Sequence, residues 1–212
     1  MKFETMVTGG SLAAALAYGL IFVERPPSLV KTVVKTLAVG LLALLVYVRG
    51  APALLVAALG LSALGDAFLA GEPKTWLRHG LGAFLAAHLA YVWLFAADGG
   101  GRAAMIAEPV RALGVAGAFA AGVTMMSWLW ASIGPLRPAV TVYAAALAAM
   151  VATAFTLPRF LWPAMPGAVL FLLSDAILSA ELFKGLRSRL ASHSVWGLYY
   201  AAQALITFAY LR

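Results

Sequence analysis

The chain of 212 residues contains no cysteine, only eight acidic residues and three histidines. Without cysteine it has no disulfide, no thiolate nucleophile and no cysteine-ligated metal, so its chemistry falls to Asp, Glu, His, Lys, Ser and Tyr. Charged residues make up 11% and hydrophobic residues 64% of the chain, against about 25% and about 45–50% in ordinary soluble domains. These proportions indicate an integral membrane protein.

The apolar residues form long runs that Pro, Gly and charged residues interrupt. A membrane-spanning helix needs about 20 mostly apolar residues, and loops as short as ERPPS and AGEPK leave no room for a soluble domain. We therefore predict an all-α membrane protein, one transmembrane helical bundle over residues 1–212. The eight predicted spans cover residues 7–23, 30–48, 52–70, 77–97, 109–131, 138–157, 163–183 and 194–211.

Basic residues outnumber acidic ones and give a net charge of +7, but they lie singly or in short groups between the apolar runs. This pattern favours anionic lipid headgroups as partners and argues against nucleic acid. Nine basic residues lie on the loops of one side, and six lie on the side that holds both termini, so the positive-inside rule places the nine in the cytoplasm. We expect a multi-pass protein of the bacterial inner (cell) membrane. The six are Lys2, Arg49, Arg102, Arg111, Arg159 and Arg212.

Two of the few acidic residues lie inside apolar runs, Asp66 in LSALGDAFLAG and Asp175 in LFLLSDAILSAEL. A carboxylate at bilayer depth costs roughly 2.5–3.5 kcal/mol on insertion scales, which makes such residues functional candidates. Lys35 enters the second predicted span from the same face as Asp66, so we expect these two residues to meet. A hydrogen bond to a neighbouring helix is the alternative explanation for any single buried Asp or His.

Several polar residues share one depth from the basic face. At 1.5 Å rise per residue, Asp175, His88 and Gln203 all lie about 14 to 15 Å deep. Tyr199 and Tyr200, a little shallower, complete a predicted polar pocket that opens toward the basic face. By contrast, the small-residue runs in the first, fifth and sixth spans indicate close helix packing, and Met125 and Met126 are interpreted as lipid-facing or packing residues.

The two halves of the chain also resemble each other. Residues 64–70 align with residues 173–179, and GAFLAAH at 82–88 aligns with GLYYAAQ at 197–203, while Lys35 and Arg137 each precede an acidic helix. We predict two parallel four-helix repeats, about 1–105 and 106–212, related by an axis along the membrane normal. Such an axis would bring the two aspartates together, one protonated and one ionised. Chance similarity between alanine-rich helices is the alternative.

The same residues carry a family resemblance. Gly65-Asp66, FLAAHLAY at 84–91, GAVLF at 167–171, Ser174-Asp175 and YYAAQ at 199–203 together resemble the YhhN-like lysoplasmalogenase family over nearly the whole chain. One departure is that Lys35 is followed by Thr36, where the family typically has a Lys-Pro pair.

The resemblance implies hydrolysis of the vinyl ether of lysoplasmalogen, a lysophospholipid. We predict no cofactor or metal, because nothing in the sequence demands one. Asp175, expected to be the deeper and more desolvated carboxyl, would donate the proton, and Asp66, held ionised by Lys35, would stabilise the cation and orient water. The reverse assignment is open. The remaining candidate residues would bind substrate: His88 and Gln203 would position water or the glycerol hydroxyl, Tyr199 or Tyr200 would cap the site, and Lys35 or Arg137 would hold the phosphate, beside Ser174.

Three other functions fit parts of the pattern. A small proton-coupled transporter would use the aspartate pair as a relay, but Gly/Pro breaks near midspan are scarce. An intramembrane aspartyl protease would need a Gly-x-Gly-Asp motif, where this chain has Ala63-Leu64-Gly65-Asp66. A metal-dependent lipid hydrolase would need closely spaced His/Asp ligands, and His79 and His193 lie at the basic face. The oligomeric state is not indicated by the sequence.

Overall fold

The part of the chain that the structure describes is helical throughout. The computed structural model describes residues 2–211, apart from the side chains of Pro73 and Lys74, and every regular element among these residues is a helix. The predicted all-α class is confirmed. Two of the basic residues that we counted for the positive-inside rule are affected. Arg212 and the side chain of Lys74 lie outside the part of the chain that the structure describes.

Each of the eight predicted apolar segments corresponds to one long helix, with ends that differ by a few residues. The sequence pattern does not indicate the four short elements, which are the π-helical turn η1, the seven-residue helix α5 and the 3-10 turns η2 and η3. In chain order the elements are α1 (Lys2–Ala17), η1 (Tyr18–Phe22), α2 (Leu29–Val48), α3 (Ala53–Leu69), α4 (Pro73–Asp98), α5 (Gly101–Ala107), α6 (Pro109–Ile133), η2 (Gly134–Leu136), α7 (Arg137–Ala154), η3 (Arg159–Leu161), α8 (Ala164–Lys184) and α9 (Arg189–Ala209).

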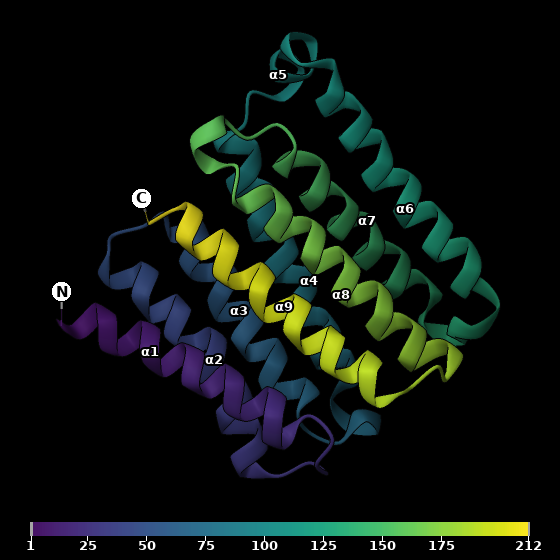
Figure 1. Ribbon diagram of the computed structural model, residues 1–212. Coiled ribbons are helices and arrows are strands. Elements are labelled where there is room, and N and C mark those ends of the chain that lie inside the picture. The colour runs from purple at the N-terminus through teal and green to yellow at the C-terminus, as the bar shows by residue number, and fades with distance from the viewer. Residues whose placement is uncertain (1, 212) are drawn as a thin grey trace. The chain divides into compact units, whose positions relative to one another are not determined.

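Residues in the loops set where several helices begin and end. Ser28 caps α2, because its side-chain oxygen accepts a hydrogen bond from the backbone N–H of Lys31 at 3.2 Å. Gly185 ends α8 in the left-handed conformation, with φ 68°, which glycine adopts without steric cost. Gly134, with φ 60°, begins the turn between α6 and α7, and these two helices lie side by side (Figure 1).

Five helical stretches among the described residues are long and apolar enough to cross a membrane. One of them, Pro109–Ala154, is 46 residues long and contains both α6 and α7. At 1.5 Å per residue these helices rise about 38 Å and about 27 Å, close to the roughly 30 Å of a bilayer's hydrocarbon core. The chain is a multi-pass membrane protein, and the count of eight spans stays a prediction. The other stretches are Lys2–Phe22, Leu29–Val48, Thr75–Asp98 and Ala164–Lys184.

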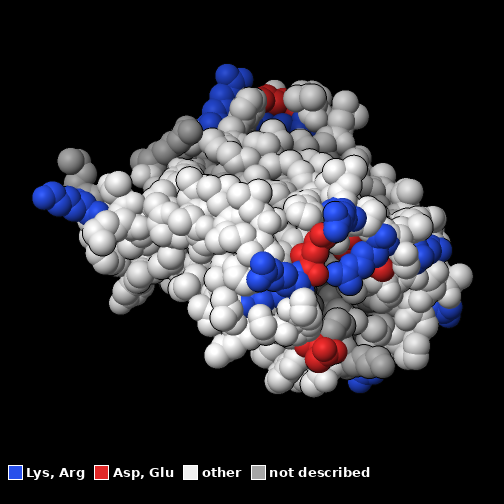
Figure 2. Space-filling model, turned by 60° about the horizontal axis from the view of Figure 1, so that its bottom comes forward, with Lys and Arg blue, Asp and Glu red and all other residues white. Residues whose placement is uncertain are grey.

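The surface fits a lipid environment. Large apolar side chains are exposed on several helices, for example Leu20 at 80%, Leu113 at 72% and Val123 at 67%. On the face drawn in Figure 2, Lys, Arg, Asp and Glu gather in a few small groups and leave most of the visible surface uncharged. Extended exposed apolar surface of this kind marks contact with a membrane or a partner protein.

The helices form two compact units. In the first unit, Met1–Ala90 with Tyr210–Arg212, α2 packs against both α1 and α3. The hydroxyl of Ser11 on α1 donates to the carbonyl oxygen of Ala38 on α2 at 2.6 Å. Val39 and Leu59 are fully buried between these helices.

The second unit, Tyr91–Ala209, is built around the pair α8 and α9, which run side by side in Figure 1. The approach is close because Gly167 has no side chain: a Cβ there would lie 3.0 Å from the backbone oxygen of Ala202. Helix α7 packs against both α6 and α8, and buried Met150 and Phe171 belong to its core. Each unit holds one of the two aspartates singled out by the sequence.

Candidate functional site

The first unit holds Asp66 in an ion pair with Lys35. Asp66 lies on α3 and Lys35 on α2, and Oδ1 of the aspartate is 3.2 Å from Nζ of the lysine. Their side chains are 1% and 13% exposed. The predicted meeting of these residues is confirmed. An ammonium group at this distance stabilises the charged form of the carboxylate.

Tyr18 adjoins this pair and belongs to the π-helical turn η1. Nζ of Lys35 lies 5.6 Å from the centroid of its ring, within cation–π range. Nζ of Lys31 lies 5.9 Å from the same ring and donates to the carbonyl oxygens of Val23 and Arg25 at 3.2 and 2.6 Å. No spacing in the sequence marks Tyr18, because tyrosines near span ends usually serve as interface residues.

The glycine immediately before Asp66 allows a close contact with α4. A Cβ at position 65 would lie 2.6 Å from two ring carbons of Phe84 on α4, closer than real contacts allow. Phe84 is itself buried, and His88, four residues later on the same helix, is fully buried. The contact between Gly65 and Phe84 therefore joins the helix that carries His88 to the helix that carries Asp66. The predicted role of His88 with the substrate stays a prediction.

The second unit holds Asp175 against a tyrosine. The hydroxyl of Tyr143 on α7 donates to Oδ2 of Asp175 on α8 over 2.6 Å. Arg137, the expected counterpart of Lys35, instead donates from Nε to the carbonyl oxygen of Trp130 at 2.9 Å. The two aligned cations therefore differ in their contacts: Lys35 pairs with Asp66, and Arg137 bonds the backbone at Trp130. Sequence reasoning missed Tyr143.

Burial does not separate the two carboxylates in the way we expected. Asp175 was predicted to be the more desolvated, but it is 8% exposed, whereas Asp66 is 1% exposed. The clear difference between them lies in their partners, an ammonium group for Asp66 and a phenol for Asp175.

Asp175 and Tyr143 also line a cavity of about 120 Å³ between α6, α7 and α8. Most of the other lining side chains are apolar, including Leu129, Leu147 and Leu172. A carboxyl group therefore faces a small, mainly apolar space within the second unit. Among residues 2–211, no three His, Asp or Glu side chains gather as metal ligands.

The other predicted residues of the second unit make contacts along α9. Ser174 donates to the carbonyl oxygen of Val195 at 2.9 Å, and Gln203, fully buried, accepts a hydrogen bond from the hydroxyl of Tyr91 at 2.6 Å. Tyr199 packs edge-on against Phe171 with ring centroids 5.3 Å apart, and Tyr200 stacks on Trp196 at 6.2 Å. The lining of the Asp175 cavity comes from α6, α7 and α8. The predicted polar pocket with these two tyrosines as its cap remains a prediction.

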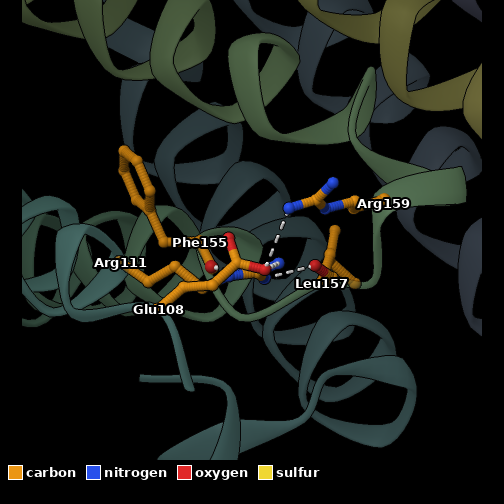
Figure 3. A network of polar contacts seen from close by, with 5 residues as sticks. All are labelled: Glu108, Arg111, Phe155, Leu157 and Arg159. Carbon is orange, nitrogen blue, oxygen red and sulfur yellow. Dashed lines mark hydrogen bonds and ion pairs between the residues drawn. The ribbon is translucent and has the colours of Figure 1, made fainter. Parts of the chain in front are cut away.

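A second polar cluster lies at the other end of α6 from Arg137 (Figure 3). Oε1 of Glu108 is 3.2 Å from Arg111 and 3.6 Å from Arg159. Arg111 also donates to the carbonyl oxygens of Phe155 and Leu157 at 3.2 and 2.6 Å. The hydrogen bond from Arg111, with the charges of both arginines, holds the pKa of Glu108 below its ordinary value of 4.5. This cluster ties the start of α6 to the segment after α7.

Comparison with known proteins agrees with the resemblance seen in the sequence. The sequence model of the YhhN family matches residues 30–210. The chain is 39% identical over 165 residues to proteins named "Lysoplasmalogenase" from Mycobacterium bovis and Mycobacterium tuberculosis, which is 72% of this chain and 58% of each relative. It is 34% identical over 209 residues to "Lysoplasmalogenase TMEM86B" from Sus scrofa, which is 91% of this chain and 80% of that protein.

The chain thus spans less than two thirds of the length of the mycobacterial relatives. No solved structure matches it. The family match nevertheless extends from α2 to the end of α9 and includes both aspartates and all the other predicted site residues. This chain belongs to the YhhN family.

Proposed function

We propose that the protein hydrolyses the vinyl ether bond of lysoplasmalogen, 1-alkenyl-glycerophosphocholine or 1-alkenyl-glycerophosphoethanolamine. The products are a fatty aldehyde and the glycerophospho head. The names of its relatives support this reaction. The main structural support is that both carboxylates are buried and have different partners. Asp66 pairs with the ammonium group of Lys35, and Asp175 accepts a hydrogen bond from the phenol of Tyr143.

Vinyl ether hydrolysis needs one acid and one anion. A proton is first added to the double-bond carbon farther from the ether oxygen, and the adjacent carbon becomes an oxocarbenium ion. Water attacks that carbon and loses a proton, and the resulting hemiacetal releases the aldehyde and the glycerol hydroxyl. A positioned carboxyl group that transfers such a proton typically contributes about 10²–10⁴ in rate.

The partners of the two carboxyls decide their roles in this proposal. Lys35 keeps Asp66 ionised, so Asp66 stabilises the oxocarbenium ion and accepts the proton from water. Asp175 is bonded to an uncharged hydroxyl, so its protonated form is more accessible, and its carboxyl group is the proton donor. Tyr143 positions that carboxyl through their 2.6 Å hydrogen bond.

The remaining candidate residues have supporting roles. Gln203, held by Tyr91, and the buried His88 position water or the glycerol hydroxyl. Tyr199 or Tyr200 caps the site. Ser174 fixes the helix that carries Asp175 by its hydrogen bond to α9.

We also propose a number of membrane spans, an internal repeat and an orientation for the chain. Eight spans, arranged as two parallel four-helix repeats, cross the bacterial inner membrane, and the loops with more basic residues lie in the cytoplasm. The apolar exposed helix surfaces support membrane insertion of both units.

The test is aldehyde release from lysoplasmalogen by the purified protein, compared with Asp66→Asn and Asp175→Asn. We expect release by the wild type and a strong loss in both variants. An ester lysophospholipid run in parallel separates vinyl ether hydrolysis from ordinary lysophospholipase activity, and a chelator tests for a metal. A wild type that releases no aldehyde, or variants that keep full activity, would refute the proposal.

A further inference from the structure

A groove of about 590 Å³ runs between α6 and α7 in the second unit. Its lining extends from Phe119 to Trp130 on α6, about 17 Å along the helix axis, and from Thr141 to Ala148 on α7. Phe119, Val123 and Trp130 are 48%, 67% and 49% exposed, so the groove is open along one side. Exposed apolar side chains of this kind mark contact with a membrane or a partner.

Small residues create this groove. At Gly122 the two helices approach closely, since a Cβ there would lie 3.4 Å from Cβ of Ala148. Ala144 and Ala145 on α7 contribute only methyl groups to the wall. The sequence pattern of small residues predicted close packing, and the structure shows that packing at one point with an open channel beside it.

The two ends of the groove differ in polarity. Ser127, Trp130 and Thr141 line the end next to the start of α7, whereas Phe119 and Ala148 line the far end. Arg137 lies at the polar end, where its guanidinium carbon is 5.0 Å from the centroid of the Trp130 ring and its Nε donates to the Trp130 carbonyl oxygen. A tryptophan and an arginine at a span end lie at the depth of lipid headgroups. Arginine is also the side chain best suited to bind a phosphate.

The groove shares part of its wall with the cavity of Asp175. Gly122, Met126 and Ala144 line both spaces. Tyr143 lies six residues after Arg137, about 9 Å along α7. A molecule with its phosphate on Arg137 would therefore place the atoms just beyond its headgroup near the depth of Tyr143 and Asp175.

We propose that this groove binds the single hydrocarbon chain of a lysophospholipid whose phosphate lies on Arg137. The open side admits the chain from the bilayer, and the apolar far end holds its tail. Because Gly122, Met126 and Ala144 line both spaces, the first carbons of the chain lie beside the Asp175 cavity. The choice of a lysophospholipid rests on the proposed function, whereas binding in the groove requires no hydrolysis.

The experiment is photo-crosslinking of the purified full chain with a non-hydrolysable 1-alkyl lysophospholipid that carries a diazirine in its chain. Mass spectrometry of the labelled peptides then locates the tail. We expect the label on α6 and α7 within the groove, and we expect unlabelled lysoplasmalogen to compete better than a two-chain phospholipid. Label spread over the other exposed apolar helices, or equal competition by both lipids, would overturn the proposal.

Matched variants test the groove and its cation separately. Ala145→Phe fills the groove and should lower labelling about tenfold, whereas Val142→Phe, at another exposed position of α7 outside the lining, should leave it unchanged. Arg137→Gln should raise the apparent Kd about tenfold, and the exposed loop variant Arg187→Gln should not. Thermal unfolding checks that all four variants fold. If Ala145→Phe folds and labels like the wild type, the groove is not the site.

The outcomes separate this proposal from the proposed function. If the wild type is labelled in the groove but releases no aldehyde, the proposed hydrolysis is refuted and the lipid site is supported. If the wild type releases aldehyde but is labelled outside the groove, the lipid site is refuted and the proposed hydrolysis is supported.

Discussion

The two units of this membrane protein each bury one aspartate on an apolar helix, and they stabilise it by different means. Asp66 faces the ammonium group of Lys35 at 3.2 Å, and Asp175 accepts a hydrogen bond from Tyr143 at 2.6 Å. A cation holds a carboxylate ionised more firmly than a neutral hydroxyl does. Similar local sequences therefore have different surroundings, because neighbouring helices supply an ammonium group to one aspartate and a phenol to the other.

The residues that precede the two aspartates extend the comparison. Gly65 allows the Phe84 ring to pack directly on the α3 backbone, whereas Ser174 uses its hydroxyl to bond the backbone of α9. One unit thus joins neighbouring helices by close apolar contact, and the other by a hydrogen bond. The substitutions below probe the two units, beginning with the largest expected effect.

Lys35→Met should be the most damaging, because it removes the ammonium group from a carboxylate that is 1% exposed. Breaking a buried ion pair on one side costs about 3–5 kcal/mol of unfolding free energy. Denaturant unfolding in detergent measures the loss. The double variant Lys35→Met/Asp66→Asn should recover part of it, and a double variant less stable than the single one would contradict the ion-pair account.

Gly65→Ser makes the first unit resemble the second at the position before its aspartate. The added Cβ overlaps the buried Phe84 ring, so we expect a loss of about 1–3 kcal/mol in unfolding free energy. The reciprocal change Ser174→Gly loses one hydrogen bond, about 0.5–1.5 kcal/mol, plus the entropy cost of glycine in a helix. Equal tolerance of serine and glycine at both positions would show that the two helix contacts are equivalent.

Tyr143→Phe removes the hydrogen bond to Asp175 and leaves the ring in place. We expect aldehyde release to fall about tenfold, equivalent to about 1.4 kcal/mol in the barrier, because the proton donor is less well positioned. Tyr47→Phe, at a tyrosine that is 68% exposed, is the control and should keep the wild-type rate. A Tyr143→Phe rate equal to that of the control would remove Tyr143 from the site.

Glu108→Gln should have the smallest effect, and that effect should depend on pH. The pKa of Glu108 is lowered in the folded protein, so its contribution to stability is present above the ordinary value of 4.5 and is lost as the pH falls through the lower folded value. The variant should therefore have a lower Tm than the wild type at neutral pH, and the gap should narrow in acid. A constant gap across this range would exclude the charge of Glu108 as the cause.

The helical fold and one of the two aspartate contacts follow from the sequence for simple physical reasons. Apolar runs of sufficient length predicted the eight long helices, and the depth of Lys35 and Asp66 from one membrane face predicted their meeting. The partner of Asp175 could not be found in this way. Tyr143 and Asp175 lie on different helices. Depth along a helix does not show toward which neighbouring helix a side chain points.

Rotation about the helix axis explains the other differences. Arg137 aligns with Lys35 in the sequence, but its Nε donates to the carbonyl oxygen of Trp130 at the end of α6. The small residues of α6 and α7 indicated close packing, and their arrangement also leaves a groove. A glycine or alanine permits either outcome, and only the placement of both helices decides between them.

The rate of aldehyde release by Asp175→Asn and Asp66→Asn, measured across pH, tests the unequal roles of the two carboxyls most directly. We predict a loss of about 10²–10⁴ in Asp175→Asn, with a residual rate that rises steadily in acid because hydronium ions must replace the missing donor. Asp66→Asn should lose activity without that rise. Equal losses with the same pH profile, or acid rescue of Asp66→Asn alone, would contradict this account.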